Sequence, residues 1–339
     1  MYSIAIHGGA GAMPRAELSQ EKEREYRASL ERALDTGYAV LERGGSSLDA
    51  VIAAVSVLED DPLFNAGRGA ALTREGAAEL DAAIMEGGQL RAGAVASVRH
   101  VKNPIQLARR VMEKSRHVLL VGSGAEEFAL EEGLSLVPNT YFRTPERQQQ
   151  LENTQRGEAV SELVPSATAG SASAGSASAG SAGSASSGVS AQSAQLAASA
   201  KGTVGAVARD AQGNLAAATS TGGMTNKRQG RVGDSPIIGA GTYAKNGVCA
   251  VSATGHGEYF IRAVAAHHIV TAVEYRGLTL EQAVRELLHT VLPRLGGDGG
   301  IIAVDAQGRT VMDFSSDGMF RGARNSEGRR QIAIYADAG

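Results

Sequence analysis

A long uncharged tract divides this chain of 339 residues into two unequal parts. Residues 163–200 contain no charged side chain, and only Ser, Ala, Gly and Thr occur from Ser166 to Ser187. Such a segment cannot bury enough apolar surface to offset the entropy that it would lose on ordering, so the sequence predicts a flexible linker here. The folded core must therefore come from the residues before and after the tract.

The composition changes abruptly at Lys201-Gly202-Thr203, where the tract gives way to a run that predicts a strand. A threonine hydroxyl at this border suggests that the protein cuts itself between Gly202 and Thr203. An N-to-O acyl shift followed by hydrolysis would give Thr203 a free α-amine, whose ordinary pKa of about 7.7–8.0 suits a general base near neutral pH. An isolated Gly-Thr pair is more often an ordinary part of a strand, so the hypothesis depends on the tract that precedes it.

The overall composition is that of a globular protein, with 43% hydrophobic and 20% charged residues. A formal net charge of -3 and an aromatic content of 4% without Trp argue against nucleic acid as a partner. Cys249 is the single cysteine, which excludes an internal disulfide and a multi-cysteine metal site. Because no leader pattern and no apolar run of membrane-spanning length occur, we expect a cytoplasmic protein without a membrane partner.

The order of the expected elements constrains the fold class. Two strand-turn-strand units are predicted at residues 203–219 and 300–314, each around an Asp-Ala-Gln-Gly turn. Helical periodicity predicts helices at 21–43, 258–275 and 280–292. Long βαβ alternation, which would predict a doubly wound parallel sheet, is missing, so a layered α/β sandwich with antiparallel sheets fits better.

Five motifs, taken in order, are similar to those of one known family. They are I-H-G-G-A-G (6–11), P-L-F-N-A-G-R-G (62–69), G-T-V-G-A-V (202–207), T-S-T-G-G-M-T-N-K (219–227) and G-R-V-G-D-S-P (230–236). With them the chain resembles the plant-type L-asparaginases, also called isoaspartyl aminopeptidases, which are N-terminal nucleophile hydrolases. The resemblance covers nearly the whole chain except the tract.

The resemblance implies an α+β fold in a single domain, 1–339: a four-layer αββα sandwich with antiparallel sheets. Self-cleavage between Gly202 and Thr203 would produce an α subunit, 1–202, that ends with the linker at about 163–200, and a β subunit, 203–339. It also implies that the working unit is a homodimer of such α/β pairs, without an organic cofactor.

The implied reaction is hydrolysis of the side-chain amide of L-asparagine, or of the isopeptide bond of a β-aspartyl dipeptide. The hydroxyl of Thr203 would attack the carbonyl, and its α-amine would move the proton. Thr221 matches a threonine beside that amine, and Asn65 matches an amide near the nucleophile. Thr254 and Gly255 match the oxyanion-binding pair, a hydroxyl and a backbone N–H that stabilise the developing charge.

Arg231 and Asp234 match the groups that bind the α-carboxylate and α-ammonium of the substrate, and an arginine fork suits a carboxylate. Gly257 matches a backbone contact to the same head group. Between Gly255 and Gly257 the family usually has a small hydroxyl residue, whereas this chain has His256. We therefore expect the reaction class to be retained and the substrate range to differ.

Residues 58–68 resemble the family's sodium-binding loop, in which backbone carbonyls coordinate the ion. Hard cations prefer oxygen ligands, whereas the segment taken alone predicts only a helix end and a turn. The matching positions for this possible structural sodium ion are Leu58, Glu59, Asp61, Phe64, Ala66 and Arg68.

Two alternatives remain open at this point. A glycosylasparaginase would share the fold, but such relatives usually place an acidic residue before the nucleophile, where this chain has Gly202. A non-catalytic protein that keeps the amino-acid pocket would remain one intact chain.

Overall fold

The computed structural model describes residues 1–11, 14–16, 18–163 and 202–336, so the predicted linker lies outside the described residues except at its first residue. The described helices are α1 (Gln20–Glu42), α2 (Ser47–Asp60), α3 (Pro104–Lys114), α4 (Gly122–Glu131), the 3-10 helix η1 (Asn139–Phe142), α5 (Pro145–Leu163), α7 (Gly257–Ala263), α8 (Ala265–Arg276), α9 (Leu280–Glu286), the π-helix η2 (Leu287–Val291) and α10 (Leu292–Leu295). The described strands are β1 (Ser3–Gly11), β2 (Leu80–Glu86), β3 (Ala92–Val98), β4 (Leu119–Val121), β5 (Val204–Arg209), β6 (Leu215–Thr221), β7 (Thr242–Lys245), β8 (Cys249–Gly255), β9 (Gly299–Asp305), β10 (Thr310–Phe314), β11 (Gly318–Asn325) and β12 (Arg330–Ala333).

The strands form two sheets of mixed origin. The larger sheet has the order β12-β11-β1-β5-β6-β2-β3-β4, so it combines strands from before the tract with strands from after it. The smaller sheet has the order β10-β9-β8-β7 and comes wholly from the second part of the chain. The two parts therefore share one large sheet rather than forming separate domains.

The expectation of purely antiparallel sheets is wrong at one edge, because β3 and β4 pair in parallel. The chain passes from β3 to β4 through helix α3, and such a crossover connection returns the chain in its original direction. The other ladders among the described strands are antiparallel.

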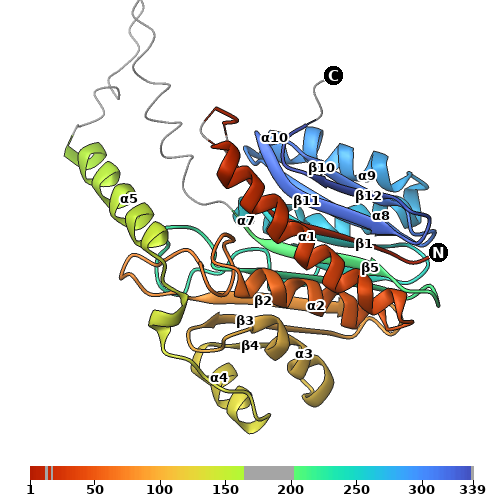
Figure 1. Ribbon diagram of the computed structural model, residues 1–339, viewed down its shortest axis with the longest axis horizontal. Helices are drawn as coiled ribbons and strands as arrows, with labels where there is room; N and C mark the ends of the chain where they lie inside the picture. Colours follow the sequence, from red (N-terminus) through yellow and green to blue (C-terminus); the bar gives the residue numbers. More distant parts are fainter. Residues whose placement is uncertain (12–13, 17, 164–201, 337–339) are drawn as a thin grey trace, which may run out of the picture.

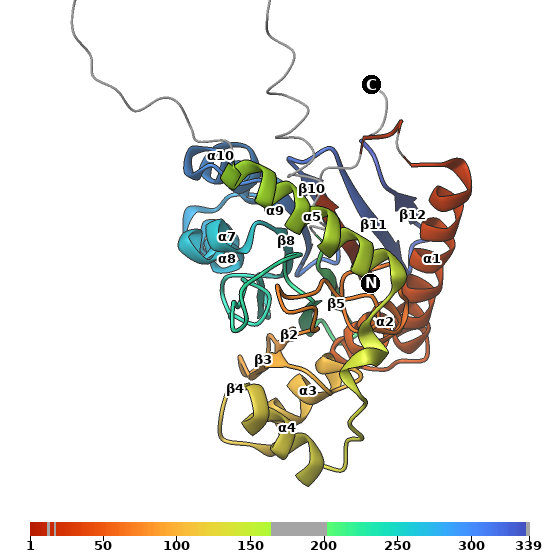
Figure 2. The ribbon, with the colours of Figure 1, turned by 90° about the vertical axis from the view of Figure 1, so that its left-hand side faces the viewer.

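Helices cover the outer faces of the sheets (Figure 1). Helices α1, α2 and α3 contact one face of the larger sheet, the smaller sheet contacts its other face, and α8 and α9 contact the outer face of the smaller sheet. Figure 2 shows the strands in the middle of the molecule, with helices on both sides. Small side chains such as Ala5, Ala217 and Ala250 fill the core between the sheets, so the two sheets approach closely.

Two helices predicted from periodicity are interrupted. The predicted helix at 258–275 is broken at Val264, which adopts the left-handed conformation (φ 47, ψ 49) and separates α7 from α8. The predicted helix at 280–292 contains the π-helix η2 in its second half.

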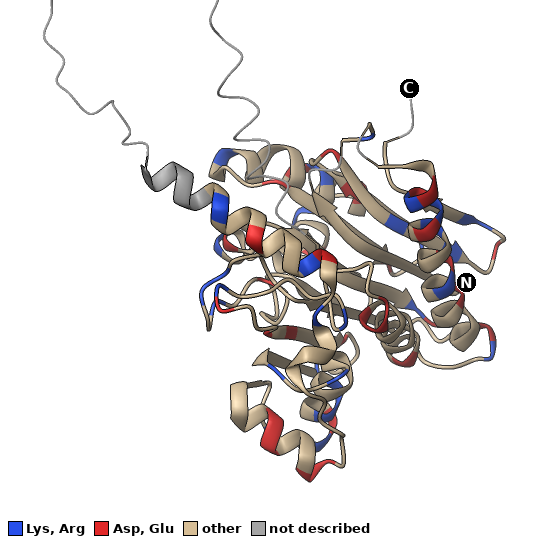
Figure 3. Ribbon diagram, turned by 60° about the vertical axis from the view of Figure 1, so that its left-hand side comes forward, with Lys and Arg blue, Asp and Glu red and all other residues tan. Residues whose placement is uncertain are grey.

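Figure 3 shows that Lys and Arg residues and Asp and Glu residues are both scattered along the ribbon. Within the part of the chain that the structure describes, no helix is both long enough and apolar enough to cross a membrane.

Candidate active site

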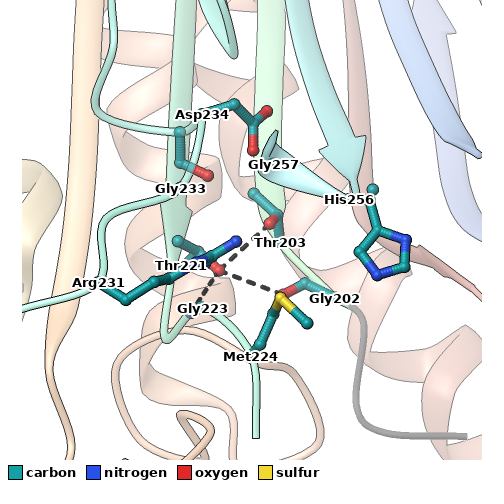
Figure 4. A pocket seen from close by; sticks show the side chains of 12 residues that line it. Gly202, Thr203, Thr221, Gly223, Met224, Arg231, Gly233, Asp234, His256 and Gly257 are labelled. Carbon is teal, nitrogen blue, oxygen red and sulfur yellow. Dashed lines mark hydrogen bonds between the residues drawn. The ribbon is translucent and has the colours of Figure 1, made fainter. Parts of the chain in front are cut away.

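A small pocket opens where β5 begins and where β6 and β8 end (Figure 4). Since β5 and β6 are antiparallel and Val204 lies opposite Ser220, the pairing brings Thr203 beside Thr221. The residues that line the pocket are Gly202, Thr203, Thr221, Gly223, Met224, Arg231, Gly233, Asp234, Ser235, Gly255, His256 and Gly257. Besides Thr203, this lining includes His256 and six of the predicted catalytic, substrate-binding and cleavage positions. These six are Gly202, Thr221, Arg231, Asp234, Gly255 and Gly257.

The hydroxyl of Thr221 connects the two residues of the predicted cleavage site. It accepts hydrogen bonds from Thr203 Oγ1 at 3.2 Å and from the Gly223 N–H at 2.9 Å. It donates its proton to the carbonyl oxygen of Gly202 at 3.3 Å. A hydroxyl has one proton and two lone pairs, so these three bonds use its full capacity. The hydroxyl of Thr203 and the carbonyl that precedes it are thereby held by one side chain.

The end of β1 lies against the same peptide, which the sequence analysis did not predict. A Cβ built on Gly9 would stand 2.7 Å from the Gly202 Cα and 3.3 Å from the Thr203 nitrogen. Gly9 has φ +111, and the pairing of β1 with β11 shifts register between His7 and Gly9. The glycine pair at the end of an apolar strand was the available signal for this close backbone contact.

Thr254 and Gly255 end strand β8 at the pocket. Gly255 lines it with φ +155, and a Cβ there would stand 2.5 Å from the Asp298 carbonyl oxygen, so this position must be glycine. Thr254 is fully buried behind the wall, and its hydroxyl accepts a hydrogen bond from the Ala10 N–H at 3.2 Å.

Asn65 also lies behind the lining residues, where it supports the loop after β6. Its Nδ2 donates to the Gly223 carbonyl at 2.7 Å, and its Oδ1 accepts from the Ala71 N–H at 2.7 Å. A Cβ built on Gly202 would stand 3.3 Å from the Asn65 Cβ, so the side chain also borders the predicted cleavage site.

Asp234 presents a buried acid to the pocket. Burial raises the pKa of its carboxyl to about 7. Its Oδ2 is buried without a hydrogen-bond partner among the described residues. Gly257 packs against it, because a Cβ on Gly257 would stand 2.9 Å from Asp234 Oδ1. A ligand with a positive charge would satisfy the free carboxylate oxygen.

Arg231 lies beside this acid but already has an ionic partner, Glu258. The Arg231 Nε–H donates to Glu258 Oε1 at 2.9 Å, and its Nη2–H donates to Oε2 at 3.0 Å. Burial acts to raise the pKa of Glu258, but the charge and hydrogen bonds of Arg231 outweigh it, and the pKa lies below its usual value. No local pattern in the sequence indicates this pair.

His256 lines the pocket across from Arg231, on the other side of Thr203 in Figure 4. Its Nδ1 lies 3.3 Å from Asp298 Oδ1, and its ring contacts Tyr259 edge to face. The side chain therefore lies away from the Arg231 and Asp234 side of the pocket, rather than crowding it.

Comparison with known proteins identifies the chain's relatives. The family model described as asparaginase matches residues 1–334. The isoaspartyl peptidase of Salmonella typhimurium is 49% identical over 94% of this chain and 93% of its own length. The isoaspartyl peptidase of Escherichia coli is 45% identical over 99% and 97%, and a probable isoaspartyl peptidase/L-asparaginase 2 of Arabidopsis thaliana is 41% identical over 98% and 99%.

The chain belongs to the asparaginase family. The predicted resemblance is thereby confirmed, and with it the assignment of the chain to a family of hydrolases.

In this asparaginase-family chain, the segment that resembles a sodium loop folds back on the end of α2. The Arg68 N–H donates to the Glu59 carbonyl at 2.7 Å, and a Cβ on Gly67 would stand 2.3 Å from that oxygen. A Cβ on Gly69 would stand 2.4 Å from the Pro62 carbonyl oxygen. Both glycines therefore pack directly against backbone carbonyls, which holds the turn close to the end of α2.

Side chains contribute little to such a site. The carboxyl of Glu59 points to other elements: its Oε1 accepts from Ser220 Oγ at 2.6 Å and from the Ile105 N–H at 3.0 Å. Burial raises the pKa of this carboxyl to about 8. Among the described residues no group of three or more His, Cys, Asp or Glu is placed to hold a metal.

Proposed function

We propose that this chain is a threonine-nucleophile amidohydrolase that cleaves the side-chain amide of L-asparagine and the isopeptide bond of β-aspartyl dipeptides. One observation carries the proposal: Thr221 binds both the Thr203 hydroxyl and the Gly202 carbonyl. The names of the relatives, isoaspartyl peptidase and isoaspartyl peptidase/L-asparaginase, support the choice of substrates.

Maturation would begin with attack of Thr203 Oγ1 on the carbonyl carbon of Gly202. The bond from that carbon to the Thr203 nitrogen breaks, and the nitrogen receives the proton lost by the hydroxyl. Thr221 donates to the carbonyl oxygen on which negative charge develops. Water then hydrolyses the resulting ester, which leaves a carboxylate on Gly202 and a free hydroxyl and α-amine on Thr203.

In the mature enzyme Thr203 would attack the substrate carbonyl, and its own α-amine would take the hydroxyl proton. The Thr254 hydroxyl and the Gly255 N–H would stabilise the oxyanion. The amine would then protonate the departing ammonia or amino acid, and water would hydrolyse the acyl-enzyme. Thr221, freed from the Gly202 carbonyl, would contact the new amine.

The substrate's aspartyl head would bind at Arg231 and Asp234. The free, buried oxygen of Asp234 suits the α-ammonium, with a further contact from the backbone of Gly257. The reacting carbonyl would then lie at Thr203, and the leaving group would extend toward His256, which supports a role of His256 in choosing that group.

We further propose that the layers form the four-layer αββα sandwich of N-terminal nucleophile hydrolases, in one domain whose α subunit ends at Gly202 and whose β subunit begins at Thr203. Two such α/β pairs would form the working dimer. Backbone carbonyls of Leu58, Glu59, Asp61, Phe64, Ala66 and Arg68 would hold a sodium ion. When bound, this ion would rigidify the loop that carries Asn65.

The test of self-cleavage is a denaturing gel of the purified chain with N-terminal sequencing of the smaller fragment. We expect a new terminus that reads Thr-Val-Gly-Ala. Thr203→Ala should remain one band and be inactive, whereas Thr225→Ala, a control at a buried threonine outside the pocket lining, should still be cut. Cleavage of Thr203→Ala at the same bond would contradict the proposal.

Two outcomes would favour the alternatives. Faster hydrolysis of N-acetylglucosaminyl-asparagine than of a β-aspartyl dipeptide would indicate a glycosylasparaginase. A chain that binds L-aspartate but stays intact and inactive after prolonged incubation would indicate a non-catalytic binding protein.

A further inference from the structure

The guanidinium of Arg231 has two edges that can each bind a carboxylate. Glu258 occupies the edge formed by Nε and Nη2. The remaining nitrogen, Nη1, lies against the pocket wall, because it would stand 3.3 Å from a Cβ on Gly223 and 3.0 Å from one on Gly233. Since both glycines line the pocket, Nη1 is the part of the guanidinium that a ligand there can reach.

We propose that Glu258 is a positioning residue for the substrate's carboxylate. It holds the outer edge of Arg231, so that the edge with Nη1 stays directed into the pocket for the α-carboxylate of the aspartyl head. This inference rests on the proposed function and extends it by one residue, Glu258.

The charges nearby explain why Arg231 needs such a partner. The ammonium of Lys227 is buried below the same loop, and a Cβ on Gly223 would stand 3.0 Å from its Nζ. Burial lowers the pKa of Lys227, whereas the charges of Asp81 and Glu79 act to raise it and the charge of Arg231 acts to lower it. Two cations that face one glycine repel each other, so the ion pair with Glu258 favours the orientation of Arg231 in which Nη1 faces the pocket.

The pair contributes little to the stability of the fold. The side chain of Glu258 is 53% exposed and that of Arg231 is 18% exposed, and ion pairs near water contribute little to folding. Glu258 lies in the first turn of α7, where its removal leaves no cavity. Loss of Glu258 should therefore change the orientation of Arg231 without unfolding the chain.

A competing interpretation makes the opposite prediction. If Glu258 only occupied the carboxylate site until substrate displaced it, its removal would strengthen binding. Positioning instead predicts weaker binding, because a planar guanidinium with five donors can bind Glu258 and the substrate at the same time, one on each edge.

The test compares Glu258→Gln with the unchanged enzyme in steady-state hydrolysis of a β-aspartyl dipeptide. We expect KM to rise about tenfold, which corresponds to the loss of one charge-assisted contact, while kcat and the extent of self-cleavage stay the same. Glu258→Asp keeps the charge but shortens the side chain, so its KM should lie between that of the unchanged enzyme and that of Glu258→Gln. The control is Glu286→Gln, which disrupts a two-bond ion pair with Arg276 on the surface and should leave KM unchanged.

Binding of L-aspartate, measured by calorimetry on the same proteins, separates this inference from the proposed function. A KM and a dissociation constant that are unchanged or lower in Glu258→Gln would overturn the positioning role. A lower kcat with an unchanged KM in Glu258→Gln would also overturn the positioning role, because this result indicates general damage to the active site. If the unchanged protein is inactive, the proposed function fails, and the dissociation constants still decide the role of Glu258.

Discussion

The ionisation of Asp234 should decide whether an amino-acid head group can bind. Its carboxyl is fully buried, its pKa is raised to about 7, and one of its oxygens has no partner among the described residues. Only the ionised form attracts an ammonium group. Because the ordinary pKa of an aspartate is about 3.9, this group titrates in a range where most carboxylates are already charged.

We therefore expect L-aspartate to bind more weakly in acid. With a pKa of about 7, the ionised fraction of Asp234 falls about tenfold from pH 8 to pH 6, and the dissociation constant should rise by about the same factor. Succinate has both carboxylates but no ammonium group, so its affinity should not fall in this range. The measurement is competitive inhibition by both compounds at several pH values. Equal pH dependence of the two inhibition constants would exclude this role for Asp234.

The sequence predicted candidate residues with reactive groups that lie together at one pocket, but it did not predict how they are held. Thr203 was predicted from its place after the linker, and Arg231 and Asp234 were predicted from a motif. Glu258 and Gly9 were missed, because their importance depends on contacts with distant parts of the chain. A glutamate in the first turn of a helix and a glycine after a strand have common local explanations.

At the scale of single elements, the irregular end of β1 shapes the predicted cleavage site. Gly9 combines a positive φ with a Cβ direction that points at the peptide between Gly202 and Thr203. A methyl group there would overlap the Gly202 Cα at 2.7 Å, well inside contact distance. One of the two segments would have to move.

Gly9→Ala should therefore block or strongly slow self-cleavage, because it displaces the Gly202 carbonyl from Thr203 and Thr221. The control is Gly247→Ala, which imposes a similar backbone penalty of about 1–2 kcal/mol at φ +80 but meets no atom within 4 Å. A denaturing gel followed over time should show slow cleavage only in Gly9→Ala. Equal rates of cleavage in both variants would contradict the role of Gly9.

Periodicity predicted helices at 21–43, 258–275 and 280–292, but not the interruptions in the last two. Residues 258–275 have the apolar spacing of one helix, but the left-handed backbone of Val264 separates α7 from α8. Helix α5 was not predicted because residues 145–162 are mostly polar, although it docks through the buried side chain of Leu151. Short strands such as β12 depend on a partner that local sequence does not reveal.

At the scale of the whole molecule, a chain of polar groups joins the two sheets beneath the pocket. His7 Nε2 lies 2.9 Å from Ser252 Oγ, which lies 2.7 Å from Thr219 Oγ1. Thr242 Oγ1 donates to the same Thr219 oxygen at 2.6 Å. These residues belong to β1 and β6 of one sheet and to β7 and β8 of the other, so the layered arrangement, which the sequence predicted only in outline, depends on buried hydrogen bonds as well as on packing.

The buried ring of His7 should make the stability of this arrangement depend on pH. Burial lowers the pKa of His7 to about 3, so the folded protein keeps the ring neutral. The unfolded chain takes up a proton near the ordinary pKa of about 6.5. Between these values the unfolded state binds more protons, so the contribution of His7 to the free energy of unfolding is complete above pH 6.5 and decreases as the solution is acidified.

This dependence can be measured by urea unfolding of the uncleaved Thr203→Ala chain, which keeps both parts covalently joined. The contribution of His7 to the free energy of unfolding should fall by about 1.5 kcal/mol from pH 6.5 to pH 5. His7→Gln lacks the titrating ring. Between pH 6.5 and pH 5 its free energy of unfolding should therefore fall by about 1.5 kcal/mol less than that of the parent chain, whatever its absolute stability. His117→Gln removes an exposed ring and should keep the original slope. Equal loss of stability in His7→Gln and in the parent on acidification would contradict this prediction. It would mean that the hydrogen bonds between the two sheets hold a charged His7 ring in the folded protein.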